Sequence, residues 1–339
     1  MRSLSVVIPA LNAAQWFPEV LSRLRAAIDE AGIHDYEIII VNDGSTDSTK
    51  EVLAELAKQY KNLVVIHQEN KGRFLARKAG IERASKEYIL FVDSRIYVDK
   101  GSIKYVVDQM KQHPEYQVWN GHVRIKLGWN IFARFWQAIT FIAWRKYLRH
   151  PRLVQFGLED FDYYPKGTGF FLAPRKVLLK HIRSFKPKVA DMKRVSDDTA
   201  LLRGLAAEMK ITIAPGFSCL YHARDRLTAF IPHTFNRGRL FVDGFLQPGN
   251  RFFGLLVLFY IMSPLAIVAL FVWPVPILLT GLIVWVVGLL IAPLALGVAL
   301  ANALSLFIVA PIFAIFYGLG LWRAAFDLGW QNLRGRRNA

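Results

Sequence analysis

The chain of 339 residues contains a single cysteine, Cys219, and has few acids for its size. One cysteine cannot form an intrachain disulfide, so nothing in the fold requires an oxidising compartment. Lys and Arg number 43 against 26 Asp and Glu, and the net charge of +17 favours contact with anionic lipid head groups or phosphorylated ligands. Residues 252–322 contain no Asp, Glu, Lys or Arg, which favours lipid and phosphate over nucleic acid as partners.

Two further absences narrow the class of protein. No signal peptide opens the chain, because Met1 leads directly into a strand-like segment that Pro9 follows. We therefore expect the head of the protein to stay in the cytosol. Residues 8–12 contain no glycine, whereas a nucleotidyltransferase is expected to carry a Gly-rich phosphate loop after its first strand.

Strand-like and helix-like segments alternate through residues 1–99. Each strand is a short apolar run rich in β-branched residues, as a buried parallel sheet requires, and the helices repeat their apolar residues at helical spacing. The predicted strands are 5–8, 37–41, 63–66 and 88–92, and the predicted helices are 19–31, 74–84 and one ending near Tyr60. Four strands with three crossovers indicate the nucleotide-binding half of a doubly wound α/β domain, whose ligands lie beyond the carboxyl ends of the strands.

Residues 100–245 are less regular, and we expect them to complete the same domain, 1–245, as its acceptor-binding half. The segments predicted there are helices near 102–112 and 197–209 and strands near 117–125 and 169–173. The segment 129–150 is rich in aromatic and basic side chains, which suits either a helix lying in a membrane interface or an ordinary aromatic core helix.

The uncharged stretch 252–322 breaks at prolines into three apolar segments, which are 252–273, 277–296 and 298–322. Each has the roughly 20 residues needed to cross hydrocarbon, so we expect a multi-pass protein of the cytoplasmic membrane. Three crossings would place the basic tail, 323–339, opposite a cytosolic head, against the tendency of basic residues to stay in the cytosol. A fourth short or re-entrant segment would remove that conflict, and the sequence leaves both topologies open.

Polar residues follow three of the predicted strands, at Asn12, Asp43 and Asp93. Asp43 stands in the turn VNDGSTD, where its carboxylate could accept hydrogen bonds from a nucleotide base or ribose, or serve only the turn. Asp93 in FVDSR could hold Mg²⁺ or Mn²⁺ between the two phosphates of a nucleotide donor, or cap the following turn. Arg95 stands where a second acid is commonly expected, and it suits a phosphate contact.

A second group of candidates lies in the other half of the head. Asp197 and Asp198 open a predicted helix, where capping and the helix dipole alone explain two acids; alternatively, one carboxylate faces the cleft as a general base. The segment KGTGFFLAPR places Gly167, Thr168 and Gly169 beside a strand, where missing side chains let a substrate approach the backbone.

Basic residues gather ahead of the uncharged stretch, in the segment YHARDRLTAFIPHTFNRGRL. A basic segment next to a membrane usually contacts anionic lipid head groups. His222, at the start of this segment, could ligate the same cation as Asp93 or be a structural histidine.

Taken in order, SVVIPALN, VNDGSTD, NKGRFLARKAGI, FVDSR, GTGFFLAPR, SDDTALLRG and the basic segment resemble the family 2 glycosyltransferases, which have the GT-A fold. The resemblance spans residues 3–241. The basic segment and the apolar tail look most like membrane-bound glycosyltransferases of the succinoglycan-type exopolysaccharide group. The residues that the resemblance implies at the nucleotide are Pro9, Asn12, Asp43, Arg77 and Asp93.

The resemblance also implies roles in catalysis. Asp198 matches the catalytic base, with Asp197 as the second candidate, and Asp93 belongs to a paired-acid motif that binds a divalent cation. The residues implied near the donor diphosphate are Arg237 and Arg239, and Arg95 is a further candidate there because its charge suits a phosphate. Two positions depart from the family pattern, because Ala13 replaces an acid after the first strand and Arg95 replaces the second acid of the metal motif.

The function expected from the resemblance is inverting transfer of a sugar from a nucleotide diphosphate sugar. The acceptor is a hydroxyl of a membrane-associated, lipid-linked molecule in polysaccharide or glycolipid synthesis. One alternative is a polyprenyl phosphate acceptor, whose oxygen is already ionised near neutral pH and needs no strong base. A non-catalytic membrane scaffold that binds nucleotide sugar is the alternative of another class.

Overall fold

The computed structural model describes residues 1–184, 197–245 and 253–337, of which the side chains at 197–200, 243–245 and 328–337 are not described. The chain divides into two compact units. The first unit comprises Met1–Lys126 and Lys146–His222, and the second comprises Leu127–Arg145 and Ala223–Ala339.

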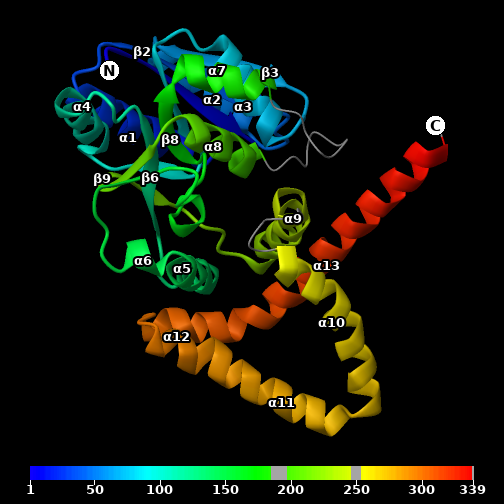
Figure 1. Ribbon diagram of the computed structural model, residues 1–339. Helices are drawn as coiled ribbons and strands as arrows, with labels where there is room; N and C mark the ends of the chain where they lie inside the picture. Colours follow the sequence, from blue (N-terminus) through cyan, green and yellow to red (C-terminus); the bar gives the residue numbers. More distant parts are fainter. Residues whose placement is uncertain (185–196, 246–252, 338–339) are drawn as a thin grey trace. The chain divides into compact units, whose positions relative to one another are not determined.

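Within the described residues, nine strands form one mixed sheet in the first unit, in the order β3-β2-β1-β4-β8-β6-β9-β5, with β7 beside β9 (Figure 1). The strands are β1 Ser3–Ala10, β2 Asp35–Asp43, β3 Leu63–Gln68, β4 Tyr88–Val92, β5 Ile96–Val98, β6 Val118–Ile125, β7 Val154–Phe156, β8 Phe170–Pro174 and β9 Ile211–Tyr221. β1 to β4 pair in parallel, and β8 joins β4 antiparallel. The predicted α/β fold class is confirmed, and each strand expected in residues 1–99 is present.

Helices cover both faces of this sheet because strand side chains alternate between two cores. Leu4 and Val6 of β1 face the core lined by α1, α2 and α4, whereas Val7 and Ile39 face the core lined by α3, α7 and α8. These helices are α1 Phe17–Glu30, α2 Thr49–Gln59, α3 Arg73–Arg83, α4 Ser102–Gln112, α7 Arg175–Ser184 and α8 Asp197–Glu208. Burial on both faces explains why the central strands read as continuous apolar runs.

Helix α3 approaches the sheet more closely than a side chain would allow. A Cβ added to Gly80 would lie 2.4 Å from Cγ1 of Val7 on β1 and 3.4 Å from Cγ2 of Val41 on β2. Ordinary contact between carbon atoms is about 3.5–4.0 Å, so only glycine permits this packing. The close approach fixes the position of α3 above the central strands.

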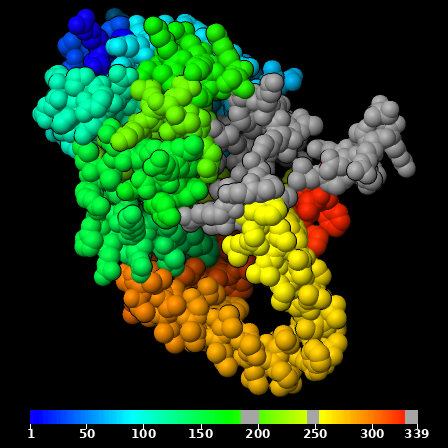
Figure 2. All heavy atoms as spheres, in the orientation of Figure 1, coloured from blue at the N-terminus to red at the C-terminus, as the bar shows by residue number. Residues whose placement is uncertain are grey.

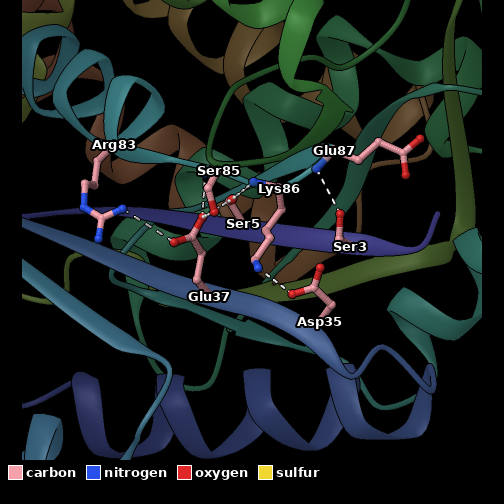
Figure 3. A network of polar contacts seen from close by, with 8 residues as sticks. All are labelled: Ser3, Ser5, Asp35, Glu37, Arg83, Ser85, Lys86 and Glu87. Atoms are coloured by element: carbon pink, nitrogen blue, oxygen red, sulfur yellow. Dashed lines mark hydrogen bonds and ion pairs between the residues drawn. The ribbon is translucent and has the colours of Figure 1, made fainter.

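A polar network joins the amino ends of β1, β2 and β4 (Figure 3). Glu37 of β2 accepts hydrogen bonds from Oγ of Ser5 at 2.7 Å, from the backbone N–H of Ser85 at 2.6 Å and from Oγ of Ser85 at 2.8 Å. Burial acts to raise the pKa of Glu37, but these hydrogen bonds and the charge of Arg83 outweigh it, so the pKa lies below its ordinary value. An ionised Glu37 therefore helps to hold three neighbouring strand ends together.

The second unit contains the apolar helices. Its helices are α5 Ile131–Ala143, α9 Leu227–Phe245, α10 Phe253–Val272, α11 Pro274–Val286, α12 Ala292–Ala295 and α13 Leu300–Arg337. Three segments of the described chain are long and apolar enough to cross a membrane, and they are Phe253–Val272, Pro274–Ala295 and Leu300–Asp327. These correspond to the three segments expected from the sequence. Side chains of α10 and α11 lie almost entirely on the surface (Figure 2), as lipid-facing helices require.

The segment 129–150 differs from the single helix that its composition indicates. It breaks at Trp144, between α5 and the short α6 Arg145–Leu148. Phe135 of α5 is buried against Phe230 of α9 in the second unit, whereas Tyr147 of α6 is buried in the first unit. The burial of Phe135 fits both roles expected for this segment, a core helix and a helix that lies in a membrane interface with its other face. The structure also groups α5 and α9 with the apolar helices, whereas the sequence analysis drew the boundary after residue 245.

Candidate active site

The carboxyl ends of β1, β2 and β4 bring the first three predicted polar residues to one edge of the sheet. Ala10 of β1 lies opposite Asn42 of β2, and β1 also pairs in parallel with β4. Asn12, Asp43 and Asp93 follow or end these three strands. Parallel α/β sheets bind their ligands at this edge, so the shared edge is the candidate site.

Asp43 is buried, and both of its carboxylate oxygens accept hydrogen bonds. Oδ1 accepts from Nε2 of Gln68 at 2.6 Å and from the backbone N–H of Lys71 at 2.8 Å, and Oδ2 accepts from the N–H of Gly72 at 2.9 Å. Because α3 begins at the next residue, Asp43 fixes the start of that helix. Contact between Asp43 and a nucleotide stays a prediction.

Asn12 organises the loop that follows β2. It adopts a left-handed backbone conformation with φ 51°, and its Oδ1 accepts a hydrogen bond from the N–H of Thr46 at 2.8 Å. Its own N–H donates to Oγ of Ser45 at 3.0 Å. Pro9 is buried within β1, opposite Val41. The nucleotide contacts implied for Pro9 and Asn12 stay predictions.

Asp93 is paired with a buried arginine. Nη2 of Arg77 donates to Oδ1 of Asp93 at 3.0 Å, and the exposed fractions of the two side chains are 1% and 29%. Arg77 lies on α3, the helix whose start Asp43 holds. Helix α3 therefore connects the two acids, because Asp43 binds the backbone at its start and its Arg77 binds Asp93. Of the two acids, Asp93 is the more exposed. The nucleotide contact implied for Arg77 stays a prediction.

The predicted acceptor loop lies directly beside Asp93. The N–H of Asp93 donates to the carbonyl oxygen of Gly169 at 2.7 Å, and a Cβ at Gly169 would lie 3.1 Å from Oδ2 of Asp93. The N–H of Gly167 donates to Oδ1 of Asn120 at 3.0 Å, and Thr168 is fully buried. The structure thus brings the 167–169 loop and Asp93 together, and contact of this loop with an acceptor stays a prediction.

Arg95 and His222 both contact a small cluster of aromatic rings. The guanidinium carbon of Arg95 lies 5.0 Å from the ring centroid of Trp16, and the N–H of His222 donates to the carbonyl oxygen of Arg95 at 3.0 Å. The imidazole lies 5.0 Å from the Trp16 ring and 4.2 Å from the Tyr97 ring, centroid to centroid.

The surroundings of His222 are positively charged as well as aromatic. Burial lowers the pKa of His222, and the charges of Lys126, Arg23 and Arg95 lower it further against the opposing charge of Glu19. A neutral imidazole is therefore favoured in a positive local field.

The expected Mg²⁺ or Mn²⁺ can be tested against these donors. Nε2 of His222 is buried and has no hydrogen-bond partner within the described residues, which by itself would suit a metal ligand. However, that imidazole packs against the Trp16 and Tyr97 rings, the Arg95 guanidinium lies on the same Trp16 ring, and one oxygen of Asp93 is taken by Arg77. No group of three His, Cys, Asp or Glu suited to a metal occurs among the described residues. Among the side chains that the structure describes, the donors at this edge do not fit a hard divalent cation, which prefers several oxygen ligands.

Asp197 and Asp198 are the first two residues of α8, and their side chains lie outside the described part of the structure. Leu201, Leu202 and Leu205 of this helix are buried in the same core as α3. The role of Asp198 as base, and of Asp197 as the second candidate, stays a prediction.

The two arginines implied near the diphosphate lie on α9 of the second unit, and both have partners there. The Arg237 guanidinium lies 4.5 Å from the ring centroid of Trp136, and its Nε is 3.2 Å from Nε2 of His233. Arg239 forms an ion pair with Asp327 of α13. Their contact with a diphosphate stays a prediction.

Several residues of the site were missed by sequence reasoning. Trp16 and Tyr97 carry no motif, and they meet His222 only in the folded sheet. Asn120 sits in an ordinary strand pattern, yet it holds the 167–169 loop. The one available signal was Gln68, a polar residue at the end of an apolar strand next to Asp43.

Comparison with known proteins places this arrangement in a family. Residues 5–178, just over half of the chain, match the family described as glycosyl transferase family 2. The chain belongs to this family. The head is therefore a family 2 glycosyltransferase domain of the GT-A type, and the apolar helices that follow it suit association with a membrane.

Relatives of this family 2 protein include two curated bacterial enzymes. It is 41% identical over 93 residues to the uncharacterized glycosyltransferase YibD of Escherichia coli (strain K12), covering 27% of this chain and 26% of YibD. It is 29% identical over 126 residues to poly-beta-1,6-N-acetyl-D-glucosamine synthase of Staphylococcus aureus (strain COL), covering 37% of this chain and 30% of the synthase. The matched segments thus span less than a third of either relative.

Among solved structures, residues 1–349 of S. aureus TarS in complex with UDP-GlcNAc are similar to this chain, with a TM-score of 0.49 and 19% identity. The similarity covers 73% of this chain and 67% of that one.

Proposed function

We propose that this protein transfers a sugar from a nucleoside diphosphate sugar to a hydroxyl group of a membrane-associated, lipid-linked acceptor, with inversion at the anomeric carbon. The observation that carries the proposal is the contact between Asp93 and Gly169 at the carboxyl edge of a family 2 domain. It joins the expected donor acid to the expected acceptor loop. Both substrates can then meet at one point, as a direct transfer requires.

The reaction is a single displacement. The acceptor oxygen attacks the anomeric carbon from the face opposite the diphosphate, and its proton passes to the carboxylate of Asp198. A bond forms between the acceptor oxygen and the anomeric carbon. The bond from that carbon to the diphosphate breaks, and its electron pair leaves with the phosphate oxygen. One displacement inverts the anomeric configuration.

The setting of the reaction follows from the apolar helices and the charge. Three segments able to cross a membrane, together with a net charge of +17, support a multi-pass protein whose head works in the cytosol against anionic lipid head groups. A role in polysaccharide or glycolipid synthesis is supported by the similarity to a synthase of poly-beta-1,6-N-acetyl-D-glucosamine.

The test is a screen of nucleotide sugars with the purified protein and a membrane lipid extract, read out as labelled lipid. We expect at least one donor to give a product. Absence of transfer and of donor hydrolysis for every donor would refute the proposal and favour a nucleotide-sugar-binding scaffold.

A pair of variants then tests the base. We expect Asp198→Asn to abolish transfer while leaving donor binding nearly intact, because the amide cannot take the acceptor proton. Asp197→Asn is the matched control, since adjacent helical positions point about 100° apart and only one carboxylate faces the cleft. Loss of transfer in Asp197→Asn alone would reassign the base to Asp197. Normal turnover by both variants would favour an acceptor phosphate, which needs no strong base.

A further inference from the structure

Arg95 is expected near the donor diphosphate, but the reaction proposed above does not say what it does there. Asp93 has the place of the first acid in a metal-binding pair, and two residues later the chain carries a guanidinium instead of a carboxylate. Arg95 lies in the turn that links β4 to β5, beside the edge where Asp93 meets Gly169. The positive charge of Arg95 is therefore expected next to the donor diphosphate.

The protein holds this guanidinium in a defined place. The Arg95 guanidinium carbon lies 5.0 Å from the Trp16 ring centroid, within the range of a cation–π contact, and its Nη1 lies 3.5 Å from the carbonyl oxygen of His222. The backbone carbonyl of Arg95 in turn accepts a hydrogen bond from the N–H of His222. A planar guanidinium held on an aromatic face loses little freedom when it binds phosphate.

The same arrangement disfavours a divalent cation. Arg77 takes one oxygen of Asp93 at 3.0 Å, and the His222 imidazole packs against both the Trp16 and the Tyr97 ring. A doubly charged ion at Asp93 would be repelled by Arg77, which already pairs with this carboxylate, and by the charge of Arg95 two residues on. A diphosphate, in contrast, is attracted to the same place.

We propose that Arg95 takes the part that a divalent cation plays in a paired-acid site, binding the donor diphosphate so that transfer needs no metal. This inference rests on the proposed function, since it assumes a nucleoside diphosphate donor. Two parallel N–H groups of a guanidinium can bind two phosphate oxygens. As the bond to the anomeric carbon breaks and its electron pair moves to the diphosphate, the fixed positive charge stabilises the growing negative charge.

The test measures binding as well as transfer, with the full chain purified in detergent. Calorimetric titrations with UDP, GDP, ADP and dTDP are run first in EDTA and then with Mn²⁺. We expect at least one nucleoside diphosphate to bind in EDTA, with an affinity that Mn²⁺ changes by less than about threefold. Transfer by the unsubstituted protein should likewise survive EDTA.

Variants at position 95 distinguish diphosphate binding by the Arg95 guanidinium from diphosphate binding by a metal ion. Arg95→Asp restores the second acid, and we expect it to weaken binding in EDTA by about tenfold or more and to recover affinity with Mn²⁺. Arg95→Lys keeps the charge without the planar fork and should show intermediate affinity in EDTA. Arg25→Asp makes the same charge change on the exposed face of α1 and should bind like the unsubstituted protein.

The outcomes distinguish this inference from the proposed function. Binding and transfer that are lost in EDTA and restored by Mn²⁺ would overturn the role of Arg95 while leaving the glycosyltransferase activity in place. Unchanged affinity in EDTA for both Arg95→Asp and Arg95→Lys would also overturn it. If Arg95→Asp fails to fold, as its melting temperature would show, the lysine variant decides alone. Failure of every nucleoside diphosphate to bind, with and without Mn²⁺, would refute the proposed function itself.

Discussion

Replacing Glu37 by Gln removes one negative charge from the network that joins β1, β2 and β4 (Figure 3). The glutamine oxygen can still accept from Ser5 and Ser85, so the loss is the ionic part of these hydrogen bonds. Hydrogen bonds to charged groups stabilise by about 1.5–3 kcal/mol against about 1 kcal/mol for neutral ones. All three bonds go to the same carboxylate oxygen and share its charge, so their losses do not add, and we expect a total loss of about 1–2 kcal/mol. The Glu37 side chain is only 13% exposed, so solvent screens it little.

The assay is thermal unfolding of the full chain in detergent, followed by intrinsic fluorescence. For a domain of 150–250 residues, a loss of 1 kcal/mol lowers Tm by about 2–4 °C, so we expect a decrease of about 2–8 °C at pH 7. Because Glu37 has a folded pKa below its ordinary value of 4.5, its stabilising charge is present above that value. It is lost as the pH falls through the folded pKa, so the difference between the two proteins should shrink below about pH 4.5.

The matched control is Glu55→Gln on the exposed side of α2. Glu55 pairs with Lys58 at 2.6 Å, but its side chain is 66% exposed, so we expect a loss below about 0.5 kcal/mol. Equal decreases in Tm for Glu37→Gln and Glu55→Gln would refute the claim that the charge of Glu37 stabilises the protein more than an exposed ion pair does. A Glu37→Gln deficit that grows as the pH falls would refute the sign of its pKa shift.

Two further variants test packing within each unit. Gly80→Ala should destabilise the first unit by about 1–2 kcal/mol, because the clash of the new methyl group with Val7 outweighs the better helix propensity of alanine. Adding Val7→Ala to this variant should relieve part of the loss. If the Tm changes of the two substitutions are strictly additive, the clash is not the cause. Asp327→Asn should lower the Tm of the detergent-purified protein by weakening the ion pair with the mostly buried Arg239, at a cost of about 1–3 kcal/mol. Asp108→Asn, which removes the partner of Lys104 on the surface of α4, is its control and should change Tm little.

The sequence by itself determined the elements of the head and the order of its motifs. Strand 88–92 and helix 102–112 have the predicted bounds, because a continuous apolar run and a helical repeat are local patterns. The same locality explains why Asp43 and Asp93 were placed at strand ends and why three apolar segments were recognised. Alternation of strand and helix then dictates a parallel sheet, which brings those ends to one edge.

Only the tertiary structure decided which partners these residues have. The pairing of Arg77 with Asp93 and the position of Arg95 on Trp16 join residues from separate elements, and no periodicity records such contacts. The break at Trp144 was also invisible, because the aromatic pattern continues through it while Phe135 and Tyr147 are buried in different units. A local sequence pattern reflects the backbone conformation of one helix or strand. Contacts between side chains of distant elements depend instead on how the folded sheet positions those elements, and close packing of the whole core determines that.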